Sequence, residues 1–244
     1  MSTKYLGIPK EPSAAGFMFI STIYGLLLAN ASAKGWIIGI ILLLLHMFTF
    51  DPILNATRTW NLRVMIYLGI ANAIPYFGLF ILGVKTLLLS LTISTIVLGS
   101  HFLVVYRRKW RDPYVYITGS AIPVLAALNI PVAVTNTLHM DVLVFWLLAS
   151  IYVISTSAYI ESILPYRKFN PKIPMIIWIP AFISIAYKVF LVIPLAEPTI
   201  KFLIHILNPV TINASPREIK RLGWREFVRF LLYVTLLLLL LRLT

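Results

Sequence analysis

Apolar runs fill almost the whole chain, and its few charged residues stand in the short gaps between them. Of the 244 residues, 60% are hydrophobic and 12% are charged. A water-soluble core of this size cannot bury so much apolar surface, so lipid must be the solvent for most of it. The sequence therefore predicts an all-α, polytopic transmembrane helix bundle formed by a single domain, residues 1–244.

Most of the apolar runs approach the length of about 20 residues that a helix needs to cross a bilayer. The second run is short, at 16 residues, and the fifth contains Pro123 and Pro131, which predict a bent or broken helix. Cutting the chain at charges and at Pro or Asn clusters predicts nine spans, at residues 13–33, 35–50, 64–84, 86–106, 113–138, 142–160, 173–193, 198–214 and 227–243.

The Lys and Arg residues are divided unequally between the two ends of these spans. If the N-terminus is inside, 16 of the 21 lie at cytoplasmic ends, and the outer set is Lys34, Lys85, Lys188, Lys201 and Arg242. Cytoplasmic loops retain cations, so this asymmetry predicts a cytoplasmic N-terminus and an outside C-terminus in a cell (plasma) membrane protein. The net charge of +13 is thereby explained by topology, and no nucleic-acid partner is expected.

Two residue types are missing from the chain. The absence of cysteine excludes disulfides, thiolate metal sites and thiol catalysis. Glutamine is absent as well, and the depletion of thermolabile side chains favours a thermophilic source. The N-terminal segment has no short apolar core followed by a small-residue cleavage site, so we expect the first span to direct membrane insertion.

Four segments of the chain carry a family resemblance: "IPKEPSAAGF", "VVYRRKWRDPYVYITGSA", "YVISTSAYIESILPYRKF" and "REIKRLGWREFVRFLLYVTLLLLL". They resemble the YwiC-like family of integral membrane proteins, and the similarity extends along nearly the whole chain. The family pattern Pro-Lys-Glu/Gln-His-Gly-Ala-Trp is matched by Pro9, Lys10 and Glu11, whereas Pro12 and Ser13 replace the His-Gly pair. The resemblance implies an association with respiratory electron transfer.

The predicted architecture is also similar to the UbiA superfamily of intramembrane prenyltransferases. Those enzymes carry aspartate-rich motifs after the second and sixth spans, which hold Mg²⁺ against a diphosphate. Here the first position offers Asp51 followed by Asn55, and the second offers Glu161. The resemblance implies a UbiA-like helix arrangement, but isolated carboxylates predict a degenerate metal site, with Mg²⁺ bound only if the protein is a prenyltransferase.

The segment "LLLLHMFTFDPILNATR", residues 42–58, changes abruptly from hydrocarbon to polar side chains. Asp51 and Asn55 are spaced to share a helical face, but Asp51 precedes Pro52, and Asp-Pro at the end of an apolar run favours a helix boundary. We predict the boundary role and keep ligand binding as the alternative. The candidate polar cluster is His46, Asp51, Asn55, Arg58 and Glu161.

His46 and His101 lie at similar distances from the cytoplasmic ends of the second and fourth spans. Histidines at equal depth on separate helices can ligate haem b from its two sides. Gly99 and Ser100 provide room beside His101, whereas large residues flank His46. We therefore predict that the isolated chain has no tightly bound haem and that His46 forms hydrogen bonds within the bundle.

Basic residues near Trp and Tyr are typical of contacts with anionic lipid head groups. Two segments of this chain have that character, one between the fourth and fifth spans and one before the last span. The predicted head-group contacts are Arg107, Arg108, Lys109, Arg111, Lys220, Arg221 and Arg225.

Three functions remain open for such a chain. The first is a non-catalytic hydrophobic subunit or partner of a respiratory electron-transfer complex, next to a b-type cytochrome. The second is a UbiA-like prenyltransferase with a degenerate metal site, and the third is a transporter or lipid-handling protein. No catalytic residue is predicted, because the sequence has no nucleophile elbow, Gly-rich phosphate loop or paired carboxylates.

Overall fold

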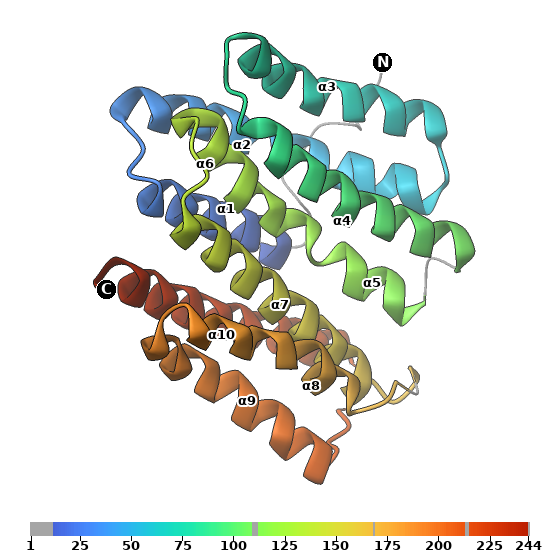
Figure 1. The fold of residues 1–244 in the computed structure, drawn as a ribbon. Helices are drawn as coiled ribbons and strands as arrows, with labels where there is room; N and C mark the ends of the chain where they lie inside the picture. Colours follow the sequence, from blue (N-terminus) through green and yellow to red (C-terminus); the bar gives the residue numbers. More distant parts are fainter. Residues whose placement is uncertain (1–11, 109–111, 168, 213–214, 244) are drawn as a thin grey trace.

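The computed structural model describes residues 12–108, 112–167, 169–212 and 215–243, and in these ranges the regular elements are all helices (Figure 1). The 3-10 segments are labelled η. In chain order the elements are α1 (Pro12–Leu28), α2 (Ala33–Arg58), α3 (Leu62–Ile81), α4 (Leu87–Arg107), α5 (Pro113–Gly119), η2 (Ile122–Leu125), α6 (Ala126–Thr135), α7 (Met140–Ile163), α8 (Ile173–Trp178), η3 (Ile179–Ala186), η4 (Val189–Leu191), α9 (Val192–Leu207) and α10 (Pro216–Leu243).

Six helical segments of the described chain are long and apolar enough to cross a membrane. The apolar helices 14–28 and 173–186 are shorter, and α10 carries charges at Glu226, Arg229 and Arg242. The all-α class and the multi-pass membrane character are therefore supported by length and composition. The number of membrane crossings and the orientation stay predictions.

Helix α2 continues through Asp51 and Pro52, so the prediction of a helix boundary at this dipeptide was wrong. Proline removes one backbone hydrogen bond from a helix. Beyond it, however, Ala56 and Thr57 are only 4% and 3% exposed, and packing of these residues keeps the segment helical to Arg58.

The last predicted spans also differ from the observed helices. The turn that separates η3 from η4 falls at Tyr187 and Lys188, whereas the sequence placed the break between residues 193 and 198. Pro194 and Pro198 lie inside α9. Helix α10 begins at Pro216 rather than at residue 227, so the basic segment before the last predicted span is itself helical.

The predicted break in span 113–138 is confirmed. A 3-10 segment, η2, separates α5 from α6, and Pro123 is the second residue of η2. Pro131, in contrast, lies within α6. The break matters for the site described below, because α5 and η2 both face a cavity.

The sequence counted Lys201 among the cations at the outer ends of the spans, but the structure does not place it at the end of a helix. It lies within α9, and its Nζ is 2.8 Å from Oε2 of Glu226. Glu226 stands between Arg225 and Arg229 on α10, which the same count placed on the cytoplasmic side. The lysine therefore belongs to the interior of the bundle and carries no information about topology.

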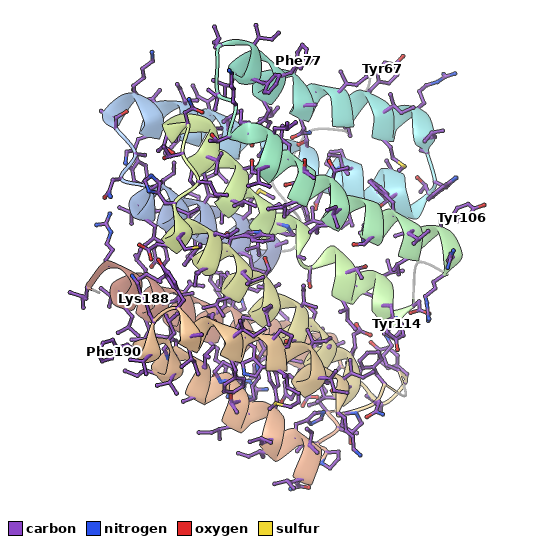
Figure 2. The ribbon with its side chains drawn as sticks, in the orientation of Figure 1. Tyr67, Phe77, Tyr106, Tyr114, Lys188 and Phe190 are labelled. Carbon is purple, nitrogen blue, oxygen red and sulfur yellow. The ribbon has the colours of Figure 1, made fainter. Side chains whose placement is uncertain are left out.

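Helices α6 and α7 form the centre of the bundle, and α3 and α9 lie at opposite edges (Figure 1). The apolar window that contains α6 is 72% buried and that of α7 is 67% buried, but that of α3 is 6% buried. Tyr67 and Phe77 project outward from α3, each 63% exposed (Figure 2). Such exposure of large side chains suits a surface that is covered by lipid.

Candidate functional site

A cavity of about 750 Å³ lies between α1, α2, α4, α5, η2, α7 and α10. One face of α7 forms a wall of the cavity, because Val153, Ser157 and Ile160 recur at helical spacing and all line it. The volume lies within the range of about 300–1,000 Å³ that is typical of small-molecule sites. Much of the lining is apolar, from Phe17, Phe50, Leu54, Val105, Val115, Pro123 and Phe227.

The charged residues of the cavity lining are one carboxylate and two cations. Nε of Arg167 lies 2.9 Å from Oε2 of Glu161, and the guanidinium lies over the ring of Tyr116, 5.2 Å from its centroid. Lys220 of α10 adds a second, exposed cation. Together these three charged groups leave one positive charge uncompensated in the lining.

The same cavity has exposed aromatic rings in its lining. Tyr166, next to Arg167, is 59% exposed, and Trp224, one helical turn from Lys220, is 52% exposed. Because Lys220 and these rings are exposed while other lining residues are buried, we infer that this charged end is where the cavity opens to its surroundings.

His101 enters the cavity lining from α4 and is 1% exposed. Its Nδ1 lies 3.0 Å from Oγ1 of Thr118. Its ring lies against Gly119, where a Cβ would stand 3.1 Å from Cε1 of the imidazole. The missing side chain at Gly119 is therefore what makes room for the ring. Nε2 of His101 has no hydrogen-bond partner among the described residues.

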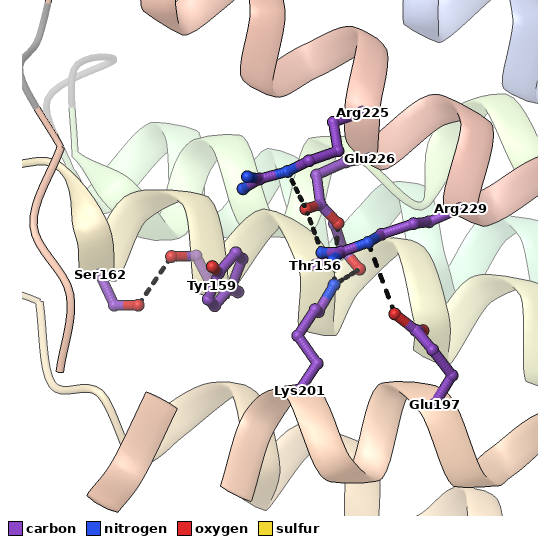
Figure 3. A network of polar contacts seen from close by, with 8 residues as sticks. All are labelled: Thr156, Tyr159, Ser162, Glu197, Lys201, Arg225, Glu226 and Arg229. Atoms are coloured by element: carbon purple, nitrogen blue, oxygen red, sulfur yellow. Dashed lines mark hydrogen bonds and ion pairs between the residues drawn. The ribbon is translucent and has the colours of Figure 1, made fainter. Parts of the chain in front are cut away.

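A buried ion cluster adjoins the cavity on its α7 side (Figure 3). Lys201 Nζ bonds Glu226 Oε2 at 2.8 Å and Thr156 Oγ1 at 3.4 Å, and Thr156 also lines the cavity. Arg229 bonds the other oxygen of Glu226 at 2.9 Å. The side chains of Lys201 and Glu226 are only 8% and 1% exposed. Buried charges in an apolar bundle are costly and usually mark function or a strong structural constraint.

The structure confirms that His46 is hydrogen-bonded within the bundle. Nδ1 lies 2.7 Å from Oδ1 of Asn72, and Nε2 lies 2.6 Å from the hydroxyl of Tyr76, both on α3. His101 has its own partner on α5. Axial ligation of a haem by His46 would have to replace one of its two hydrogen bonds.

The other members of the predicted polar cluster are not brought together at the cavity. Glu161 lines it, but α2 contributes Phe50, Leu54 and Thr57 there and neither Asp51 nor Asn55. No group of three or more His, Cys, Asp or Glu side chains able to hold a metal occurs among the described residues. The side chain of Arg58 lies outside the described part.

The predicted head-group contacts have different surroundings. Arg107, Arg221 and Arg225 are exposed, as a lipid contact requires. Arg108 pairs with Asp112 at 3.1 Å and lies over the ring of Tyr114. Lys220 is exposed and also lines the cavity. Lys109 and Arg111 are outside the described residues, as are Pro9, Lys10 and Glu11 of the YwiC-like pattern.

Sequence reasoning missed the residues that shape the site most. Lys201 was counted among the cations that indicate topology, and Glu226 was grouped with the basic residues before the last predicted span. Tyr152 and Gly119 received no role. No clear sequence signal pointed to Glu226, because Arg225 and Arg229 flank it in the chain and supply nearby cations as partners.

No family model, curated protein or solved structure matches this chain. The fold and the site are therefore interpreted from their geometry.

Proposed function

We propose that this chain is an integral membrane protein that binds an amphiphile with an anionic head group, a lipid-handling role. The observation that supports this most directly is the cavity of about 750 Å³ with an apolar lining and a net positive end. Arg167 and Lys220 would attract the head group, and the apolar walls would hold the chain. Exposed Tyr166 and Trp224 suit the level of lipid head groups.

Binding can be tested with dodecyl phosphate added to the protein in dodecyl maltoside micelles. A ligand at about 100 times its Kd adds about 2.7 kcal/mol to the free energy of unfolding. We expect dodecyl phosphate to raise the unfolding temperature by several degrees and dodecyltrimethylammonium, with the same chain and a cationic head, to leave it unchanged. Equal shifts from both amphiphiles would contradict the proposal.

Two matched pairs of variants locate the binding. Gly223 lines the cavity and has open space where a Cβ would stand, as has Gly78 on α3; Gly223→Leu should therefore abolish the shift, and Gly78→Leu should not. Lys220→Gln should weaken it, whereas Lys85→Gln, at an exposed lysine away from the cavity, should leave it intact. Loss of the shift in the Gly78 or Lys85 variant would point to unspecific binding.

The prenyltransferase hypothesis requires a ligand of the same chemistry, since a prenyl diphosphate is an anionic amphiphile. It also requires a Mg²⁺ site, for which Asp51 and Asn55 would have to reach the cavity near Glu161. Phe50 and Leu54 of α2 occupy that wall instead. Ligand binding without prenyl transfer is therefore our preferred proposal.

A second proposal is a hydrophobic subunit of a respiratory electron-transfer complex, as the YwiC-like motifs imply. The observation that favours it is α3, whose apolar window is only 6% buried and which therefore offers a long face to another membrane protein. In this role the haem would be held by the partner.

An optical spectrum of the purified protein tests this role. We expect no Soret band from the isolated chain, because both ring nitrogens of His46 are engaged by Asn72 and Tyr76. A haem-containing partner should copurify from native membranes and bring its own Soret band. A band that remains with the isolated chain and is lost in both His46→Ala and His101→Ala would instead make this chain the electron carrier.

A further inference from the structure

Apart from the ion pair of Glu161 and Arg167, two polar side-chain atoms of cavity-lining residues are buried without a hydrogen-bond partner among the described residues: Nε2 of His101 and Oη of Tyr152. Both residues are 1% exposed. Buried polar groups in folded proteins are almost always hydrogen-bonded, so an unpaired one calls for a partner that the chain itself does not supply. A ligand in the cavity is such a partner.

The hydrogen bonds around Thr118 determine what His101 can offer. Oγ1 of Thr118 donates its only proton to the carbonyl of Tyr114, at 2.8 Å. The same Thr118 oxygen can therefore act only as an acceptor of a hydrogen bond from Nδ1 of His101, which lies 3.0 Å away. In a neutral imidazole with the proton on Nδ1, Nε2 is an acceptor. Nε2 of this cavity-lining residue is thus a buried, unsatisfied hydrogen-bond acceptor, which a ligand carbonyl, ether or plain hydrocarbon cannot satisfy.

Tyr152 is fixed by aromatic packing on the α7 wall of the cavity. Its ring stacks on Tyr233 with centroids 4.5 Å apart and meets Trp178 edge to face at 6.2 Å. A ring held in this way cannot turn its hydroxyl out to solvent. The phenol both donates and accepts, so it complements a hydroxyl group.

Resting on the function proposed above, we propose that the amphiphile carries hydroxyl groups along its apolar chain, which donate to Nε2 of His101 and accept from Oη of Tyr152. Along α7, Tyr152 precedes Glu161 by nine residues, a rise of about 13 Å. The hydroxyl groups are therefore expected in the middle of the chain, away from the anionic head. The substrate class is a hydroxylated lipid anion.

The test compares stearate with a set of hydroxystearates whose hydroxyl lies at successive mid-chain carbons. Apparent dissociation constants are measured by thermal-shift titration of the intact protein. One good hydrogen bond is worth about a tenfold change in affinity, so the best hydroxystearate should bind about tenfold more tightly than stearate. In Tyr152→Phe and in His101→Phe, the dissociation constants of the best hydroxystearate and of stearate should become nearly equal.

Tyr233→Phe is the matched control. Tyr233 is a buried tyrosine whose hydroxyl also has no hydrogen-bond partner among the described residues, and it does not line the cavity. Its loss should leave the preference for hydroxystearate unchanged. Tyr152→Phe removes only an unpaired oxygen, so the variant should fold as stably as the parent. A lost preference for hydroxystearate at unchanged stability would then indicate a ligand contact and not a structural role.

The outcomes separate the two proposals. Equal binding of stearate and every hydroxystearate would overturn the hydroxyl inference and leave the lipid-binding function standing, with water satisfying His101 and Tyr152. A preference that survives both cavity variants, or that is lost in Tyr233→Phe, would overturn it as well. Failure of stearate, dodecyl phosphate and the hydroxystearates to bind would overturn both proposals.

Discussion

Glu226→Leu is expected to lower the free energy of unfolding by about 3–5 kcal/mol, because removal of one partner leaves a buried charge uncompensated. The orphaned charge is Lys201, whose side chain is 8% exposed and whose Nζ lies 2.8 Å from the carboxylate. Arg229 loses a bond to the same carboxylate, but it retains Glu197 at 3.5 Å. Unfolding by SDS in mixed micelles, followed by tryptophan fluorescence, measures the change.

Glu197→Leu provides the matched control for this prediction. Glu197 belongs to the same cluster, yet its side chain is 54% exposed, and exposed ion pairs contribute about 0–1 kcal/mol. The double variant Lys201→Met/Glu226→Leu should recover most of the lost stability, since it removes both buried charges. If Glu226→Leu costs no more than Glu197→Leu, the buried pair is not a structural element of the bundle.

The helical, membrane-spanning class was predictable from the sequence because apolar composition acts locally. A run of hydrocarbon side chains in lipid must satisfy its backbone groups internally, whatever its neighbours are. The break near Pro123 was predictable for a similar reason, since proline removes a hydrogen bond in its own helix. No knowledge of tertiary contacts was needed for either prediction.

Helix limits and the role of Lys201 depended on tertiary contacts and were therefore mispredicted. Pro52 resembles a helix end in the sequence, but Ala56 and Thr57 beyond it are buried and hold the helix together. Lys201 resembles a loop cation, but Glu226, 25 residues later in the chain, pairs with it. A proline therefore marks a helix end only where the residues beyond it are not held by packing. A lysine marks the end of a span only where no buried carboxylate pairs with it.

The candidate site was less predictable than the fold. The sequence pointed to Gly99 and Ser100 as the source of room beside His101, because they precede it in the chain. In the structure Gly99 has nothing within 4 Å of a Cβ position, and it is Gly119 of α5 that contacts the ring. Residues next to one another in a helix point in different directions, so the neighbour in space was on another element.

The second large loss of stability is expected for Gly25→Ala, because α1 and α6 approach each other closely at this residue. A Cβ at residue 25 would stand 2.6 Å from the carbonyl oxygen of Ala127 and 2.9 Å from Cγ of Pro131. A backbone oxygen inside α6 cannot move without the helix, so the two helices would have to separate. Overpacking of this kind typically costs about 1–3 kcal/mol, and occasionally more.

Two other glycines distinguish this clash from a general effect of alanine in a helix. Gly78→Ala meets nothing within 4 Å on α3, so it should gain up to about 1 kcal/mol from helix propensity. At Gly16 the obstructing atoms belong to the side chain of Phe227, which can rotate away, so an intermediate loss is expected. SDS unfolding of the three variants should therefore rank Gly25→Ala as the least stable and Gly78→Ala as the most stable. If Gly25→Ala were as stable as Gly78→Ala, α1 and α6 could not be in backbone contact at this position, and the cavity wall that α1 provides would have to be placed differently.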